Sequence, residues 1–588
     1  MGSILRLPTV RELTLRPRNQ QLLTMPMKRR AQEPLELTTG ADSPASKRAR
    51  VEDELLVNGE STSNGHLMPL RPQDRDRIDI LGADEVLHEE LEEAAATPDA
   101  LELASHAVPD QGYEELYLDT VDRKVLDFDF EKLCSITLSH MNVYACLICG
   151  KYFQGRGPKS QAYFHAINVD HHVYINMETK KIYVLPEGYE VTNPLLNDIK
   201  YVVDPRYTKE EVSKLDTDLK SRWDLLGKEY TPGFVGINNI KANDYFNAVI
   251  HALAHVRPLR NYFLLEDMAS RNQLSQRFSV LVRKIWNPRA FKSHVSPHEL
   301  LQEVALNSDK KFTLTEQADP AELLSWLLHR LHLALGGKAN APGSSIIHKV
   351  FQGSLQHESQ LITARANAGD RLIFEDAAIE IQASKFLLLT LDLPSAPLFR
   401  DELDENTIPQ VSLLDLLQKY DGIHAQEKMK NRVRYRLMHP LPPYVIFLIK
   451  RFEKRKFLDE RNPTIVTWDP TRPIDLNPYC MPDPNLHNPS EEVRYELVAN
   501  VIHEGVKVRD DSVSGEREKS VWKVQLKDKS RDEWVEVQDL FVRKVPKETL
   551  FAAESYIMIW EKKSKTKTTW SSCKGKSTAL AQTKKIAR

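Results

Sequence analysis

The chain has 588 residues, too many for one ordinary domain and enough for about two to four. Its 41% hydrophobic and 28% charged residues allow sizeable cores, and a net charge of −3 gives no global reason to expect nucleic-acid binding. Five cysteines are too few for a disulfide scaffold and no apolar run is long enough to cross a bilayer, so we expect an intracellular protein with no membrane partner.

The first region, 1–112, contains no aromatic residue. Such a region buries too little apolar surface to offset chain entropy, so we expect it to be mostly disordered, apart from an acidic helix over 81–96. Two basic clusters, MKRR (27–30) and ASKRARVED (45–53), are typical of nuclear localisation signals, although a solvated charge run is the alternative. We therefore expect the protein in the nucleus.

The next region, 113–205, contains a metal-ligand pattern. The pattern is Cys-x2-Cys-x15-His-x5-His, formed by Cys146, Cys149, His165 and His171. Two thiolates on a tight knuckle and two imidazoles suit tetrahedral zinc, so we predict one structural Zn²⁺, with His172 as an alternative to His171. Only Cys134 and His140 are spare upstream, so we expect no second complete site.

A DNA-reading zinc finger is the obvious rival for this pattern. Such a finger needs a helix that runs into the histidines and points side chains at base edges. Here the insert is rich in glycine and aromatic residues, and HHVYINMETKKIYVLPEGY (171–189) alternates like a β-hairpin. The sequence therefore disfavours a DNA-reading finger.

Beyond the zinc segment we expect a helical linker over 206–230, because KEEVSKLDTDLKSRWDLLGKEY has helical spacing. Residues 231–562 begin with helical segments and continue with β-branched and aromatic runs, which predicts a domain of the α+β class. The tail, 563–588, carries basic but no acidic residues. We expect it to be disordered, with RNA or acidic proteins as weak partners.

Several stretches of the 231–562 domain carry motifs in a fixed order. They are GINNIKANDYFNAVIHAL (236–253), QADPAELLSWLLHRL (317–331), FQGSLQ (351–356), FLLLTLDLP (386–394), LPPYVIFLIKRF (441–452), YELVANVIHEG (495–505) and WVEVQDLFVRKV (534–545). Together they resemble the catalytic domain of the ubiquitin-specific protease family, and the zinc segment resembles that family's ubiquitin-binding zinc finger. The resemblance implies a papain-like fold of fingers, palm and thumb, preceded by a small zinc-binding α+β module.

The resemblance also assigns roles to four positions of this chain. Asp244 stands at the nucleophilic cysteine, Ala242 at the oxyanion-stabilising asparagine, Ser520 at the general-base histidine and Asp539 at the residue that orients the base. A carboxylate at a helix start gains a capping interaction but is a poor nucleophile toward an amide. Without nucleophile, oxyanion donor and base, a triad cannot operate, so we expect a pseudoenzyme.

A zinc module followed by a domain with these replacements resembles an inactive subgroup of the family that acts in the spliceosome. This resemblance implies a non-catalytic scaffold that assembles or holds the tri-snRNP in pre-mRNA splicing, with tri-snRNP proteins as partners. Two alternatives stay open. One is an adaptor that binds ubiquitin without cutting it, using Arg156 for the ubiquitin tail, and the other is an atypical active deubiquitinase.

Overall fold

The structure is a computed structural model. It describes residues 116–338, 341–366, 372–376, 378–395, 408–428, 431–454, 459–482, 493–509 and 516–563. The predictions for 1–112, including the acidic helix and the basic clusters, and those for nearly all of the tail lie outside these residues. No helix within the described ranges is long and apolar enough to cross a membrane.

The zinc-finger segment folds around a five-stranded antiparallel sheet in the order β2-β1-β3-β4-β5. Its strands are β1 (Val143–Cys146), β2 (Tyr152–Gln154), β3 (Val173–Asn176), β4 (Ile182–Val184) and β5 (Glu190–Val191). Two helices accompany the sheet, α3 (Gln161–Val169) and α4 (Asn197–Val203). The alternation that disfavoured a DNA-reading finger corresponds to the pairing of β3 with β4.

The linker differs from the helix predicted over 206–230. Helix α5 spans only Lys209–Lys214, and the following strands β6 (Arg222–Trp223) and β7 (Glu229–Tyr230) form a hairpin. The Asp224 carboxylate accepts hydrogen bonds from two backbone amides of the turn, and Gly227 adopts a φ of 78°. This turn chemistry outweighs the helical spacing, so the prediction was wrong beyond Lys214.

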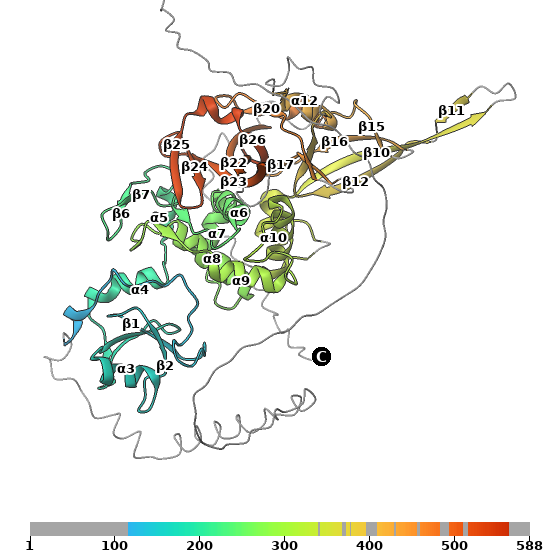
Figure 1. Cartoon of the computed structure of the whole chain (residues 1–588). Coiled ribbons are helices and arrows are strands. Elements are labelled where there is room, and N and C mark those ends of the chain that lie inside the picture. The colour runs from blue at the N-terminus through green and yellow to red at the C-terminus, as the bar shows by residue number, and fades with distance from the viewer. Residues whose placement is uncertain are drawn as a thin grey trace, which may run out of the picture. The chain divides into compact units, whose positions relative to one another are not determined.

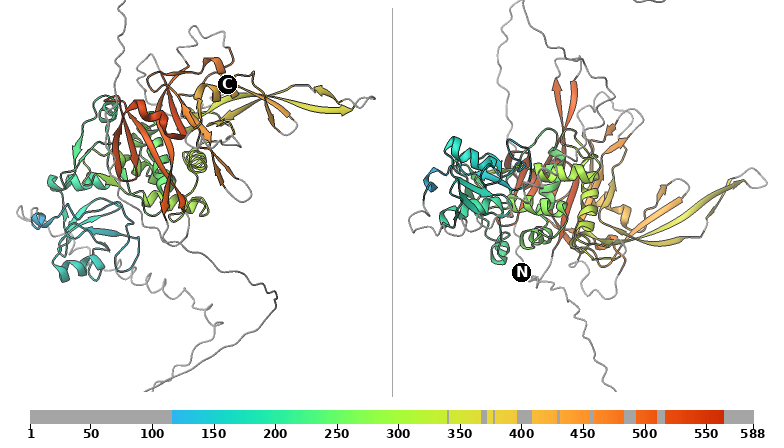
Figure 2. Two further views of the ribbon diagram at one scale, coloured as in Figure 1. Left: turned by 45° about the horizontal axis from the view of Figure 1, so that its top comes forward. Right: turned by 90° about the horizontal axis from the view of Figure 1, so that it is seen from below.

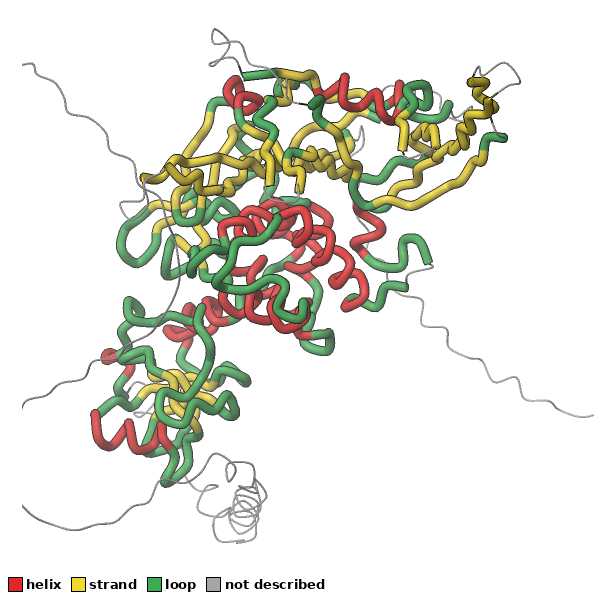
Figure 3. Tube along the Cα trace, turned by 45° about the vertical axis from the view of Figure 1, so that its right-hand side comes forward, coloured by secondary structure: helices red, strands yellow, loops and turns green. Residues whose placement is uncertain are grey.

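A layer of helices follows in the sequence. It comprises α6 (Asp244–Ala254), α7 (Arg257–Leu265), α8 (Gln273–Ile285), α9 (His298–Asn307), α10 (Pro320–Ala334) and α11 (Ile346–Phe351). Figure 3 shows these helices gathered against the sheet strands of the domain. The QADPAELL motif contributes the start of α10, where the Asp319 side chain accepts from the Ala321 amide and caps the helix.

An eight-stranded sheet forms the centre of the domain, in the order β13-β17-β26-β22-β23-β24-β25, with β21 paired to β22 (Figure 1). Its strands are β13 (Leu389–Asp392), β17 (Tyr444–Lys450), β21 (Ile474–Asp475), β22 (Arg494–Arg509), β23 (Glu516–Asp528), β24 (Glu533–Gln538), β25 (Phe541–Val545) and β26 (Glu554–Lys562). Among the described residues of this sheet, β13 and β17 pair in parallel and the other neighbours are antiparallel. The motif LPPYVIFLIKRF supplies β17, which is a largely buried strand.

A second five-stranded sheet extends from the domain as a long ribbon, which Figure 2 shows in two further views. It contains β10 (Gly353–Ala366), β11 (Leu372–Asp376), β12 (Glu380–Phe386), β15 (Gln426–Lys428) and β16 (Asn431–Met438). The remaining elements are short: α12 (Leu413–Leu417) and the pairs β8 (Gly236–Ile237) with β9 (His294–Val295), β14 (Gln410–Ser412) with β20 (Ile465–Thr467), and β18 (Phe452–Lys454) with β19 (Asp459–Arg461).

The large sheet separates two apolar cores. Val501, Val524 and Ile557 belong to the core that includes the helices, whereas Trp534 and Trp560 belong to the core on the opposite side. Helix α6 packs on β22 and β23, and all of its residues are buried. A helix enclosed on every side can be apolar around its circumference. This packing confirms the α+β class and places the Asp244 end of α6 against the sheet.

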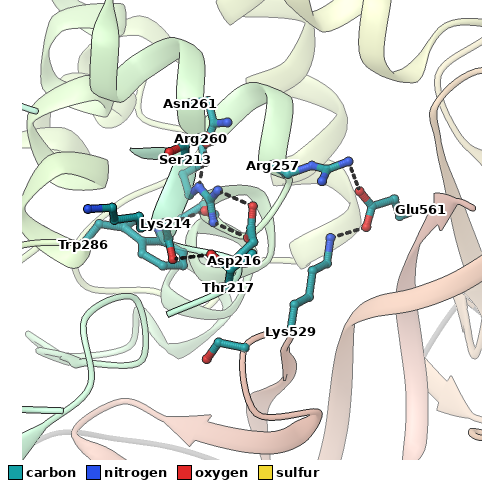
Figure 4. A network of polar contacts seen from close by, with 12 residues as sticks. Ser213, Lys214, Asp216, Thr217, Arg257, Arg260, Asn261, Trp286, Lys529 and Glu561 are labelled. Atoms are coloured by element: carbon teal, nitrogen blue, oxygen red, sulfur yellow. Dashed lines mark hydrogen bonds and ion pairs between the residues drawn. The ribbon is translucent and has the colours of Figure 1, made fainter. Parts of the chain in front are cut away.

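A network of ion pairs joins the chain after α5 to the helices and the sheet (Figure 4). The guanidinium of Arg260, whose side chain is 2% exposed, donates to both oxygens of Asp216 at 2.9 Å and lies 4.6 Å from the ring centroid of Trp286. Nearby, Arg257 lies 3.2 Å from Glu561 of β26. Burial works against ionisation of Asp216, but its ion pair and hydrogen bonds with Arg260 hold its pKa below the ordinary value.

Candidate functional site

The Asp244 carboxylate is the centre of the candidate site. Asp244 is the first residue of α6 and is only 6% exposed. The side-chain amide of Gln317 donates to both carboxylate oxygens at 2.8 Å, and the backbone N–H of Trp522 donates to Oδ2 at 2.9 Å. The carboxylate thus joins the segment before α10 to strand β23. Because the carboxylate accepts hydrogen bonds from both elements, it holds α6 to the segment before α10 and to β23.

The Gln317 amide also reaches the expected position of the general base. Its Nε2 atom donates to the backbone carbonyl of Ser520 at 3.1 Å, so one amide group bridges Asp244 and β23. The sequence motif contains Gln317, but its spacing gave no sign of these contacts. The structure therefore adds Gln317 and the backbone of Trp522 to the residues that build this site.

The asparagines before α6 hold the loop in place. The Asn243 side chain donates to the Asn238 backbone carbonyl at 3.1 Å and to the side-chain Oδ1 of Asn247 at 3.0 Å, and it accepts from the Ile240 backbone amide at 2.6 Å. Asn243 is fully buried. Ala242 precedes it with a methyl group that has no hydrogen-bond donor. The polar loop before α6 is therefore held by hydrogen bonds among its own residues and to Asn247.

Asp539 lies beside the loop that precedes α6. Its carboxylate accepts from the side-chain amides of Asn247 at 2.8 Å and Asn239 at 2.9 Å, and its carbonyl accepts from the Ile237 amide at 2.9 Å. Asp539 has a φ of 51°, in the left-handed region that aspartate tolerates better than most residues. The structure thus brings Asp539 to the loop before α6, where asparagines are its partners.

Ser520, which the family resemblance places at the general base, lies on β23. In the described part of the same sheet, His503 is paired across the strands with Trp522. The His503 ring lies 3.3 Å from a Glu554 oxygen. Among the described residues, no histidine forms a hydrogen bond with Asp244. The arrangement of hydrogen bonds around Asp244 holds helix α6 to the sheet.

The predicted metal ligands come together in the zinc-finger segment. Their ligand atoms all lie within 4.8 Å of one another, in a cluster of Cys146, Cys149, His165 and His171. Cys146 ends β1, and the Gly150 amide donates to its carbonyl at 2.9 Å to close the knuckle, with a φ of 73° at Gly150. Across the described ranges this is the one cluster of its kind.

The two adjacent histidines point in different directions. A ring nitrogen of His171 lies 3.7 Å from the Cys146 sulfur and 3.1 Å from Nε2 of His165. His172 instead contacts the Leu185 carbonyl at 2.7 Å and the Asp170 carboxylate at 2.8 Å. The set of two thiolates and two imidazoles therefore suits tetrahedral zinc with His171 and without His172.

The Arg156 side chain makes two contacts within the zinc-finger segment. Its guanidinium carbon lies 4.3 Å from the ring centroid of Tyr183, and Nη1 donates to the Gly188 carbonyl at 3.2 Å. A ubiquitin tail that used Arg156 would compete with both contacts.

Comparisons with known proteins agree with this architecture. The family described as ubiquitin carboxyl-terminal hydrolase matches residues 235–560, and the zinc finger found in ubiquitin hydrolases and other proteins matches 133–196. The latter match and the cysteine–histidine cluster identify a zinc-binding module.

Two relatives and one solved structure extend over most of the chain. The probable mRNA-splicing protein ubp10 of Schizosaccharomyces pombe is 50% identical and covers 77% of this chain and 89% of its own length. The pre-mRNA-splicing factor SAD1 of Saccharomyces cerevisiae is 30% identical, over 76% of this chain and 93% of its own. The crystal structure of an essential yeast splicing factor is 30% identical, with a TM-score of 0.61, over 76% of this chain and all of its own. With its domain match and these similarities, the chain belongs to the ubiquitin carboxyl-terminal hydrolase family, in the ubiquitin-specific-protease fold with an N-terminal zinc finger.

Proposed function

We propose that this protein is a non-catalytic scaffold that assembles or holds the spliceosomal tri-snRNP in pre-mRNA splicing. The observation that carries the proposal is Asp244, a buried carboxylate at the start of α6 whose oxygens are already bonded to Gln317 and Trp522. The splicing role is supported by the two relatives named as splicing proteins and by the yeast splicing-factor structure. The same similarities support a nuclear location and tri-snRNP proteins as partners.

The chemistry of the residues around the start of α6 supports a pseudoenzyme. Amide hydrolysis by this family's triad needs a nucleophile, a base that takes its proton, and donors for the developing oxyanion. Asp244 lacks the nucleophilicity of a thiolate, Ser520 lacks the basicity of an imidazole, and the Ala242 side chain has no hydrogen-bond donor. Loss of one oxyanion donor alone typically lowers the rate by about 10²–10³. The Gln317 amide bridges Asp244 and the Ser520 backbone carbonyl, so the contacts of Asp244 are those of a structural residue.

The zinc module has a structural role in this proposal. We assign Cys146, Cys149, His165 and His171 as the ligands of one Zn²⁺. Four protein ligands leave no open coordination position for a substrate, which is typical of structural rather than catalytic zinc. Binding of zinc to such a module contributes on the order of 10 kcal/mol to its folding. The module would then serve the scaffold as a rigid unit.

Two measurements on the full-length protein test the proposal. Immunoprecipitation at low salt should recover spliceosomal proteins and small nuclear RNAs, and the purified protein should not hydrolyse a ubiquitin–fluorophore amide. Recovery of no spliceosomal component would refute the scaffold role. Turnover of the amide that disappears in Asp244→Ala would refute the pseudoenzyme and favour an atypical deubiquitinase.

A further inference from the structure

The segment that leads into the zinc-finger sheet, residues 127–132, contacts helices of the hydrolase domain, which is the family match at 235–560. We call this segment the strap. It contains no helix or strand, yet its Phe128 side chain is buried in the apolar core of the zinc-finger segment. Phe291, which lies between α8 and β9 of the hydrolase domain, belongs to the same core. One apolar core thus contains side chains of both modules.

A buried lysine holds the strap to α8. Lys284 is 8% exposed, and its ammonium donates to the Asp129 carboxylate at 2.6 Å and to the Phe128 carbonyl at 2.9 Å. The second oxygen of Asp129 accepts from the Ser296 backbone amide at 3.1 Å. Burial works against the charged ammonium, but the carboxylates of Asp129 and Glu299 raise the pKa of Lys284 above its ordinary value. Lysine is almost never buried without a partner, and here the strap supplies that partner.

Ion pairs of both signs flank this contact. Glu299 of α9 lies 2.6 Å from the Lys132 ammonium of the strap and 3.0 Å from the Arg277 guanidinium of α8. Lys292 of the hydrolase domain pairs with Asp127 of the strap. Acids of the strap therefore meet lysines of the domain, and a lysine of the strap meets an acid. A displaced strap would lose this match, so the charges favour a single position for it.

The zinc-finger sheet also holds the strap. The Tyr152 hydroxyl donates to the Asp127 carbonyl at 2.7 Å, and the Tyr152 carbonyl accepts from the Ser135 amide at 2.8 Å. Tyr152 begins β2 directly after the cysteine knuckle, where the Cys146 amide donates to the Lys151 carbonyl at 2.9 Å. The assigned zinc ligands therefore lie next to the strand that holds the strap.

We propose that the strap locks the zinc-finger segment onto α8 and α9, so that the two modules form one rigid body and zinc binding also stabilises these helices. Both modules belong to the same compact unit of the fold. A metal that binds only the folded module stabilises every contact that depends on that fold. The lock rests on the zinc ligands assigned above and not on splicing, and it would give a scaffold two surfaces at a fixed spacing.

The test is hydrogen exchange of the full-length protein, measured by mass spectrometry with zinc bound and after chelation with EDTA. In wild type, chelation should accelerate exchange in β1 to β5 and, by at least about tenfold, in α8 and α9. Asp129→Ala leaves Lys284 without its carboxylate, so exchange of α8 and α9 should be at least about tenfold faster with zinc bound. Chelation should then accelerate it little further.

A second substitution keeps the test decisive if Asp129→Ala disturbs the zinc-finger segment itself. Lys284→Met alters the lock from the hydrolase domain, at a position remote in sequence from the zinc ligands. If the two groups form the lock, the double variant should accelerate exchange of α8 no more than Asp129→Ala alone. Independent groups would multiply their effects, and that result would overturn the lock.

Glu533→Ala is the matched control, because it breaks a 2.7 Å ion pair with Lys544, whose side chain is 67% exposed. It should leave exchange in α8 and α9 within about twofold of wild type. Chelation that removes the zinc but leaves α8 and α9 unchanged would overturn the lock, as would wild-type exchange in Asp129→Ala. Failure of the immunoprecipitation described above would instead refute the scaffold and leave the lock standing.

Discussion

Replacement of Asp244 by alanine tests whether this buried carboxylate stabilises the fold. The change removes the acceptor of the Trp522 amide and of the Gln317 side chain, while Gln317 keeps the Ser520 carbonyl. A buried donor left without a partner costs about 1–3 kcal/mol, and the partial loss at Gln317 adds about 1 kcal/mol. We therefore expect Asp244→Ala to lower the free energy of unfolding by about 2–4 kcal/mol.

The assay is chemical denaturation of the full chain, followed by tryptophan fluorescence, together with hydrogen exchange of the peptide around Trp522. Exchange at that amide should accelerate, because its hydrogen bond to the carboxylate is lost. Asp244→Asn keeps one acceptor oxygen and should lose about half as much stability, on the same scale of 1–3 kcal/mol per donor. Asp267→Ala, at a largely exposed side chain 3.7 Å from Arg206, should change stability by less than about 0.5 kcal/mol.

The opposite result would refute this reasoning. Burying a carboxylate without a cationic partner has a desolvation cost, and if that cost exceeded the value of the three hydrogen bonds, Asp244→Ala would stabilise the protein. A gain in stability, or a loss no larger than that of Asp267→Ala, would show that the contacts of Asp244 do not hold α6 to β23.

Three further predictions concern other parts of the chain. Asp216→Ala leaves the Arg260 guanidinium buried without its partner, and chemical denaturation should show a loss of about 3–5 kcal/mol. Burial lowers the pKa of His251 to about 3 and that of His255 to about 4, from an ordinary value of 6.5. Below pH 6.5 the unfolded chain therefore binds more protons than the folded protein. The contribution of the two histidines to the free energy of unfolding is complete above that pH and is lost as the pH falls. In denaturation experiments at pH 5 the loss should be about 2 kcal/mol per histidine. Chelation of zinc, or Cys146→Ala, should unfold the zinc module, seen as rapid hydrogen exchange across β1 to β5.

Each of these predictions has a matched control. Asp218→Ala breaks a 3.6 Å ion pair between exposed side chains, and a loss as large as that of Asp216→Ala would contradict the argument from burial. His251→Leu should remove about half of the stability difference between pH 7 and pH 5, and an unchanged difference would assign that dependence to other groups. Cys480→Ala alters a buried thiol outside the metal cluster, so it should leave the zinc content unchanged.

The wrong helix prediction for the linker shows where sequence patterns compete. The apolar spacing of 209–230 suits a helix, and the Thr208–Glu211 capping box does begin one. The Asp224-Leu-Leu-Gly sequence favours a turn over a helix, because the Asp224 side chain accepts hydrogen bonds from backbone amides that a helix would use itself. The turn sequence was visible in the chain, but the helix prediction relied on the helical spacing of the apolar residues instead.

The amino-acid sequence by itself determined which chemical groups this protein has. The Cys-x2-Cys knuckle and the later histidines predicted the cluster that the structure brings together, and the ordered motifs predicted the α+β domain. The assignment of Asp244 to the nucleophile position came from the resemblance to the protease family and stays a prediction. The metal-ligand pattern depends on residue type and short spacing, which are local properties of the chain.

Only the tertiary structure decided which partners these side chains have. Gln317 lies 73 residues from Asp244, Trp522 lies 278 residues away, and Asn247 meets Asp539 across 292 residues. Such contacts form because α6 packs on β22 and β23, and no local pattern records that packing. The two histidines before β3 likewise separate only in three dimensions, because a His171 ring nitrogen lies 3.7 Å from the Cys146 sulfur whereas His172 contacts the Leu185 carbonyl.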